Sequence, residues 1–223
     1  MQQAWHWADA EARYRDALGT DPNDAPAHLG LGALLVHRGR TEEGLVLVRR
    51  GRELDPLSPA TTVQVGWVLY HARRYDDAIR ELRLALGADP ENVFALWYLG
   101  FALLEVSEHD EAIRTLERAA TMWNQNPAAL GILARAYGRA GRHAEATRIL
   151  RDLTARAERG YIPPAVFVNA YIGIGDLDRG IAWLERAYEE RSNIIRFLKT
   201  HPLFDPIRND PRFIELSRRV GLL

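Results

Sequence analysis

Histidine and glutamate side chains recur at a fixed interval along the chain, and these residue types could bind a metal ion. His37, His71 and Glu105 follow one another in steps of 34 residues, and the same step separates His109 from His143. Imidazole and carboxylate groups are common zinc ligands. If each step is one structural unit, equivalent atoms in neighbouring units lie on the order of 10 Å apart. That is too far for a shared ion unless the side chains lean together, so we expect a solvated rim and no metal site.

Paired acidic residues could act as a general acid and a general base. They too recur with the 34-residue step, as Glu42-Glu43, Asp76-Asp77 and Asp110-Glu111. Each pair stands where an apolar helical pattern begins, and the positive end of a helix dipole favours acids there. The sequence contains no nucleophile elbow, phosphate loop or HExxH motif. We therefore expect no enzymatic activity and no cofactor.

Composition narrows the class of protein. The 223 residues are 47% hydrophobic and 26% charged, which is enough apolar material for a folded core. A net charge of -1 argues against a nucleic-acid partner or a polybasic membrane surface. The lack of cysteine removes disulfides, thiolate metal sites and cysteine nucleophiles, and it is neutral about the compartment. The chain also lacks a long apolar run and a basic-then-apolar leader. These features predict a cytoplasmic protein that has no membrane association.

An internal repeat of 34 residues organises the elements that must position these side chains. Small residues mark it at Ala10, Gly44, Ala78, Ala112, Ala146 and Gly180. Around them, apolar residues at i, i+3, i+4 and i+7 predict two helices in each unit. Where two helices cross, a small side chain lets their backbones approach closely. Aspartate-proline pairs at Asp21-Pro22, Asp55-Pro56 and Asp89-Pro90 predict the ends of units, because proline cannot continue a helix.

These positions resemble the tetratricopeptide repeat (TPR) family from about Trp7 to Ser192. The resemblance implies an all-α fold, a right-handed superhelical solenoid of antiparallel helix pairs. The family's usual tryptophan is replaced, for example by His28 and Thr62, and its final proline by Asn124, Glu158 and Ser192. We expect a half repeat (second helix only) at 1–24, repeats at 25–58, 59–92, 93–126 and 127–160, a degenerate repeat at 161–192, and a C-terminal cap at 193–223.

The two ends of the chain differ in character. The N-terminal half repeat predicts either a native capping helix or a domain that continues a longer chain, and we favour the longer chain. At the other end, Asp205-Pro206 and Asp210-Pro211 each predict a helix start, with an aspartate N-cap before proline. Phe213, Leu216 and Val220 then form the apolar stripe of a capping helix. Such tails resemble those that close TPR regions of bacterial multidomain regulators.

The resemblance also implies a concave groove that is lined by the first helix of each unit. Its inward positions carry Val63, Trp67, Tyr70, His71, Phe94, Trp97, Phe101, Glu105, Arg135 and Arg139. We expect Trp67, Tyr70, Trp97 and Phe101 to present partly exposed rings to a peptide, with Arg135 and Arg139 pairing with an acidic residue of that partner. The alternative is that these aromatics are packed in the core, since aromatic stripes at helical spacing usually are.

Three function classes follow. The favoured one is a scaffold that binds a protein or peptide in the groove, as the interaction or sensory region of a bacterial regulator. A second is homodimer formation through the N-terminal edge, where Trp5, Trp7 and Tyr14 would form an apolar patch. A third is sensing of a small ligand in the groove, which would control a separate effector domain.

Overall fold

The computed structural model describes residues 7–222, and every regular element in that range is a helix. The helices are α1 (Trp7–Thr20), α2 (Ala25–His37), α3 (Thr41–Leu54), α4 (Pro59–His71), α5 (Tyr75–Ala88), α6 (Val93–Glu105), α7 (His109–Met122), α8 (Pro127–Arg139), α9 (His143–Ala157), α10 (Pro164–Gly173), α11 (Leu177–Glu189), the 3-10 helices η1 (Asn193–Phe197) and η2 (Pro202–Ile207), and α12 (Pro211–Arg219).

Polar caps start the first helix of most pairs. The side chains of Asp24, Ser58, Asn92 and Asn126 each accept a hydrogen bond from a backbone N–H in the first turn of α2, α4, α6 and α8. These bonds satisfy donors that a helix start otherwise leaves unpaired. The second helices α3, α5, α7 and α9 lack such a side-chain cap and begin with acidic residues instead.

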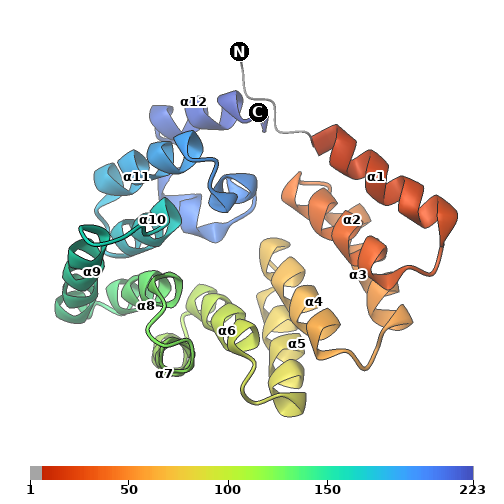
Figure 1. Cartoon of the computed structure of the whole chain (residues 1–223), viewed down its shortest axis with the longest axis horizontal. Coiled ribbons are helices and arrows are strands. Elements are labelled where there is room, and N and C mark those ends of the chain that lie inside the picture. The colour runs from red at the N-terminus through yellow and green to blue at the C-terminus, as the bar shows by residue number, and fades with distance from the viewer. Residues whose placement is uncertain (1–6, 223) are drawn as a thin grey trace.

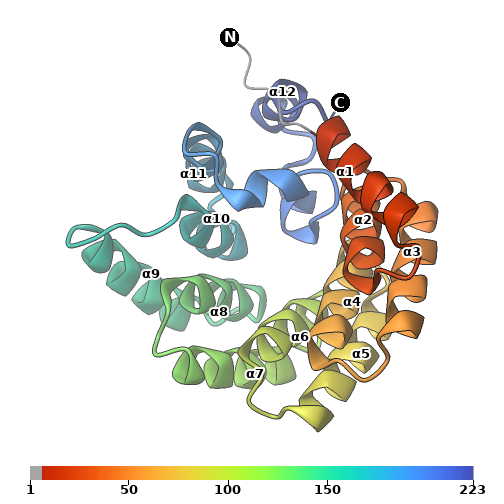
Figure 2. The same ribbon diagram turned by 45° about the vertical axis from the view of Figure 1, so that its right-hand side comes forward.

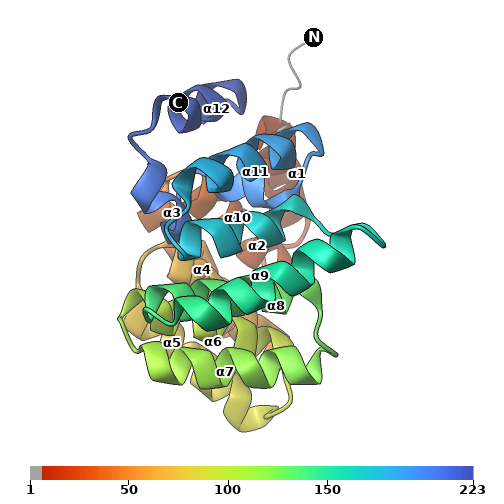
Figure 3. The ribbon, with the colours of Figure 1, turned by 90° about the vertical axis from the view of Figure 1, so that its left-hand side faces the viewer.

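Consecutive helices form antiparallel pairs, and the pairs stack around a curve (Figure 1). Helices α2, α4, α6, α8 and α10 pack against one another on the inner side. Their partners lie outside, and Figure 3 looks onto α7, α9 and α11 from the outer side, with α10 visible between α9 and α11. The small residues have the expected packing role: a Cβ atom on Gly44 of α3 would lie 2.5 Å from the backbone oxygen of Gly32 in α2. The predicted helical solenoid is confirmed.

The curve nearly closes into a ring (Figure 1). Trp7 of α1 packs both against Leu31, Leu34 and Leu35 of α2 and against the C-terminal apolar cluster that contains Phe204. The first and last elements of the solenoid therefore share apolar contacts.

The C-terminal tail departs from a simple end cap. α12 packs on α11, and Phe213, Leu216 and Val220 are buried as predicted. Before α12, however, residues 193–207 (η1, η2 and their connection, hereafter the C-terminal segment) run through the interior of the ring (Figure 2).

The two predicted helix starts in the tail have different outcomes. Asp210 is the N-cap of α12, as expected, and its side chain accepts from Arg212 N. The prediction for Asp205 is wrong, because η2 has already begun at Pro202. His201 is its N-cap and accepts from Leu203 N through Nδ1.

Candidate binding site on the concave face

All ten predicted groove residues lie on three inner helices, but their exposure differs from the expectation. α4 carries Val63, Trp67, Tyr70 and His71, α6 carries Phe94, Trp97, Phe101 and Glu105, and α8 carries Arg135 and Arg139. Val63, Tyr70, His71, Phe101 and Arg135 are buried. The expectation of partly exposed rings is therefore wrong for Tyr70 and Phe101. It is correct for Trp67 and Trp97, which are half-buried.

The C-terminal segment covers the buried part of the groove. The Tyr70 hydroxyl lies 3.3 Å from His201 Nδ1, and His71 Nδ1 lies 3.0 Å from the Thr200 hydroxyl. The Phe197 ring stacks on the His71 ring with centroids 4.7 Å apart. The chain thus fills part of its own concave surface with aromatic and polar side chains that a partner would otherwise supply.

An ion pair fastens the segment to the far side of the ring. The Arg73 guanidinium, just after α4, donates two hydrogen bonds to the Asp205 carboxylate at 2.8 and 2.6 Å. Burial alone would raise the pKa of Asp205, but the hydrogen bonds from Arg73 and Arg208 lower it below its usual value. Both partners are about half exposed, so solvent screens the pair and its stabilisation is small.

Arg135 and Arg139 already pair with an acidic residue of this chain, Glu105. Arg135 Nη2 donates to Glu105 Oε1 at 2.6 Å, and Arg139 Nη1 lies 3.2 Å from Glu105 Oε2. The expectation that both arginines are free is wrong because Glu105 stands one unit earlier on the neighbouring inner helix and neutralises them. Arg135 is only 2% exposed, which leaves no surface for a ligand.

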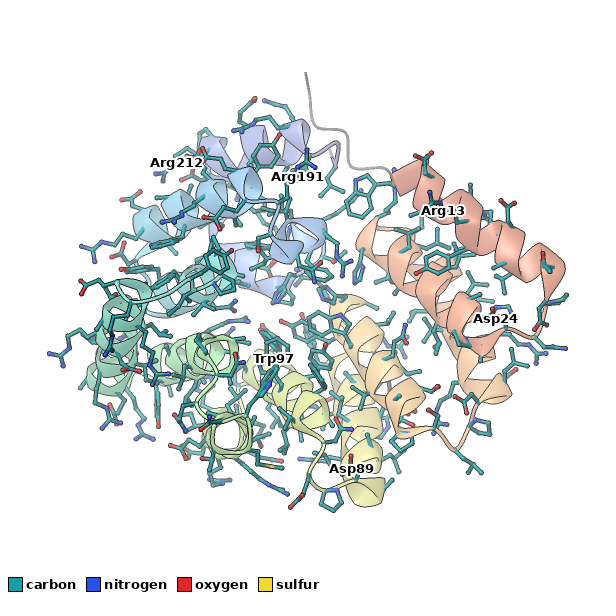
Figure 4. The ribbon with its side chains drawn as sticks, viewed as in Figure 1. Arg13, Asp24, Asp89, Trp97, Arg191 and Arg212 are labelled. Carbon is teal, nitrogen blue, oxygen red and sulfur yellow. The ribbon has the colours of Figure 1, made fainter. Side chains whose placement is uncertain are left out.

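An aromatic surface remains open on α6. The Phe94 side chain is 50% exposed, and its ring centroid lies 5.3 Å from that of Trp123 and 6.4 Å from that of Trp97. Beside it, a groove of about 360 Å³ runs between α4 and α6, and its lining includes Gln64 and Tyr98. Figure 4 shows Trp97 on α6, at the edge of the ring's interior. We name this region, formed by Gln64, Phe94, Trp97, Tyr98 and Trp123, the aromatic surface.

A second hollow lies where the C-terminal segment meets the inner helices. This interior cavity has a volume of about 240 Å³, and its wall includes Trp67, Trp97, Phe101, Phe197 and Arg196. Partial burial of the Arg196 guanidinium lowers its pKa. Because the residue itself stays exposed, the cation stands at the mouth of an apolar space.

The fold buries part of the predicted self-association patch. Trp7 is half-buried between the N-terminal and C-terminal apolar clusters. Tyr14 is 37% exposed and covers Gly30, where an added Cβ would meet its ring. Trp5 lies outside the residues that the structure describes. Dimer formation through this edge stays a prediction, now with a smaller apolar area to drive it.

The repeated histidines lie closer together than their sequence spacing predicted. The ring centroids of His37 and His71 are 4.7 Å apart, so the expected separation on the order of 10 Å is wrong for this pair. Both rings lean toward Phe197, whose centroid is 4.7 Å from each. Glu105 pairs with arginines instead of joining them. Between residues 7 and 222, no cluster of three or more histidine or acidic residues has a geometry that could hold a metal ion.

Sequence reasoning missed the residues that the tail contributes, namely Asn193, Arg196, Thr200, His201 and Asp205. These residues lie outside the repeat, so no repeat register predicts which residues they contact. One signal was available. The tail has more large apolar residues than α12 alone can bury, including Phe197, Leu198, Leu203 and Phe204.

Comparison with known proteins supports the same architecture. Family models described as tetratricopeptide repeat match residues 4–61, 65–127 and 103–161, which is more than half of the chain. No curated protein matches the sequence. Within the described residues, no helix has both the length and the apolar character needed to cross a membrane.

Solved structures of low sequence identity share the fold. MamA from Desulfovibrio magneticus RS-1 is 17% identical with a TM-score of 0.59, over 70% of this chain and 88% of that one. PilF from Pseudomonas aeruginosa is 18% identical with a TM-score of 0.58, over 86% and 87% of the two chains. MamA AMB-1 is 24% identical with a TM-score of 0.56, over 70% and 100%. With the repeat models matched along the sequence and paired helices stacked in space, the chain belongs to the tetratricopeptide repeat family.

Proposed function

We propose that this protein is an interaction scaffold that binds a peptide segment of a partner protein at the aromatic surface. The observation that carries the proposal is Phe94, a large ring half exposed on an inner helix and flanked by Trp97 and Trp123. Exposed aromatic clusters beside a groove are the usual anchors of protein interfaces. Repeat solenoids commonly bind partners on their concave side.

The chemistry of the aromatic surface favours a peptide with an apolar anchor. An aliphatic or aromatic side chain can pack against Phe94 and Tyr98 in the groove between α4 and α6. Gln64 is half-buried in the same groove and makes no side-chain hydrogen bond with a described residue, so its amide can pair with a peptide backbone. The originally predicted deeper anchors, Tyr70 and Phe101, lie beneath the C-terminal segment and are not part of this proposal.

A random-peptide phage library panned on the intact protein tests the proposal. Enriched peptides are synthesised and their affinities measured by fluorescence polarisation for the wild type, Phe94→Ala and Leu84→Ala. Leu84 is a matched control, since it is 60% exposed but lies on the outer helix α5. We expect Phe94→Ala to weaken binding by about tenfold or more, as for an interface anchor, and Leu84→Ala to leave it unchanged. Peptides that lose affinity only with Leu84→Ala, or no enrichment at all, would contradict the proposal.

The wider setting stays a prediction. A scaffold of this kind suits the interaction or sensory region of a bacterial regulator, with a protein partner, no nucleic-acid partner and a cytoplasmic location. A net charge of -1 and the lack of a catalytic motif in the sequence support this assignment.

A further inference from the structure

The interior cavity has the composition of a small-molecule site. Its walls come from α4, α6, α8 and α10 on one side and from η1 on the other. Trp67, Trp97, Tyr98 and Phe101 supply aromatic surface from the inner helices, and Phe197 supplies it from the C-terminal segment. At about 240 Å³ the cavity is smaller than most drug-sized pockets, which measure roughly 300–1,000 Å³. It therefore suits a ligand with one ring and a short substituent.

Two polar side chains of η1 line the same cavity. Asn193 and Arg196 are three residues apart in a 3-10 helix, where side chains at i and i+3 lie on the same edge. Both residues are exposed, and neither forms a side-chain hydrogen bond or an ion pair with any residue between 7 and 222. Other arginines near the groove are neutralised, Arg135 and Arg139 by Glu105, and Arg73 and Arg208 by Asp205.

The charge at the cavity is uncompensated. Arg196 is the charged residue in the described lining, which includes no carboxylate. His201 also lines the cavity, and burial keeps it neutral by lowering its pKa. A guanidinium carries donors in a planar fork that matches a carboxylate, and an amide N–H₂ adds another donor. An anion beside apolar walls would satisfy both the charge and the aromatic surface.

We propose that the interior cavity binds a small aromatic carboxylate. The ring packs against the half-buried Trp67 and Trp97, and the carboxylate accepts hydrogen bonds from Arg196 and Asn193. This site adjoins the proposed peptide surface and shares Trp97 and Tyr98 with it, but it differs in the positive charge that Arg196 of the C-terminal segment supplies. Since helices and segment each supply part of the wall, a bound ligand also stabilises the docked segment by mass action.

Titration calorimetry of the full chain with 3-phenylpropionate and indole-3-acetate tests the site, with neutral 3-phenylpropionamide as the matched ligand. We expect both acids to bind and the amide to bind at least about tenfold more weakly, because it lacks the charge-assisted bond. Arg196→Gln should weaken the acids by about tenfold or more, whereas Arg151→Gln should leave their affinity unchanged. Arg151 is an exposed arginine of the outer helix α9, and its substitution by glutamine removes the same charge as Arg196→Gln.

A steric variant gives an independent measurement. Ala128 lines the cavity from α8 and is half-buried, so Ala128→Phe fills part of the space while the Arg196 side chain is kept. It should abolish binding of both acids while the far-UV circular dichroism and the melting temperature show a folded chain. If Ala128→Phe does not fold, the Arg196→Gln comparison decides alone. Equal binding of acid and amide, unchanged affinity in folded Arg196→Gln, or no binding of either acid would overturn the proposal. Phage peptides that depend on Phe94 would still support the scaffold function in that case.

Discussion

The Glu105 carboxylate shows how one residue can serve structure where a binding role was expected. It joins Arg135, which is 2% exposed, to Arg139, whose side chain is 35% exposed. Such a buried ion pair adds little net stability over an apolar pair, but removal of one partner leaves an uncompensated charge in a low-dielectric site. The two arginines thus differ in their dependence on Glu105, although both contact it.

Substitution of Glu105 separates the two contacts. Glu105→Ala should lower the free energy of unfolding by about 3 kcal/mol, because Arg135 remains buried without a partner. Arg139→Ala should cost less than about 1 kcal/mol, since solvent already screens that ion pair. Urea denaturation followed by circular dichroism measures both values. Equal losses in the two variants would show that Arg135 finds another partner or water.

At the scale of helices, the turn inside each pair imposes one backbone requirement. Gly39, Arg73, Ser107, Gly141 and Gly175 occupy equivalent positions 34 residues apart, and all have positive φ values between 60° and 86°. Glycine adopts this conformation without strain, whereas Arg73 and Ser107 adopt it at some cost. Gly39 also allows a close approach, since an added Cβ would lie 2.7 Å from Lys199 Cε of the tail.

The helices were predictable, because the 34-residue register fixes which residues face each other, and the Asp210 cap was predictable from its aspartate-proline pair. The exposure of the groove was not. Tyr70 and Phe101 occupy inward positions as expected, yet they are buried by His201, a residue outside the repeat. Arg135 has the right register for a partner contact, but Glu105 on the adjacent helix already pairs with it. A long-range contact between a repeat and a non-repeating tail has no periodic signal in the sequence.

Two glycines test how closely the inner helices pack. A Cβ atom on Gly138 of α8 would overlap the backbone carbonyl of Gly173 at the end of α10, which cannot move aside as a side chain can. Gly138→Ala should therefore destabilise the protein by about 1–3 kcal/mol. A Cβ atom on Gly87 of α5 would meet no atom within 4 Å, so Gly87→Ala should be neutral or stabilising by up to about 1 kcal/mol.

Thermal and urea unfolding of the two glycine variants supply the comparison. Both substitutions add one methyl group to a helix, so their intrinsic helix propensities change alike. A difference between them isolates the contact of α8 with α10. If Gly138→Ala were as stable as the wild type, these two helices would have to lie farther apart than the structure places them.

At the scale of the whole molecule, ring closure brings a buried histidine cluster together. His37 on α2, His71 on α4 and His201 in the C-terminal segment come together from distant parts of the chain, with ring centroids 4.7 Å apart for the first pair and 5.3 Å for the second. Burial lowers the pKa of each, to about 3 for His37, and nearby positive groups act in the same direction. Arg196 faces His37 and His71, and Arg135, Arg208 and Arg73 act on His201.

These shifts predict an acid-sensitive closure. A histidine has a pKa of about 6.5 in the unfolded chain, so the neutral cluster stabilises the fold fully above that pH and loses this stability as the pH falls below it. For His37 alone the loss between pH 7 and pH 4.5 should be about 2.5 kcal/mol. Urea denaturation at the two pH values measures it, and small-angle scattering reports whether the ring opens. His37→Phe keeps an aromatic ring that cannot be protonated and should remove about that much of the pH dependence, whereas His143→Gln, an exposed change on α9, should not. A pH dependence that is identical in His37→Phe and the wild type would mean that carboxylate groups, and not the histidine cluster, govern the acid response.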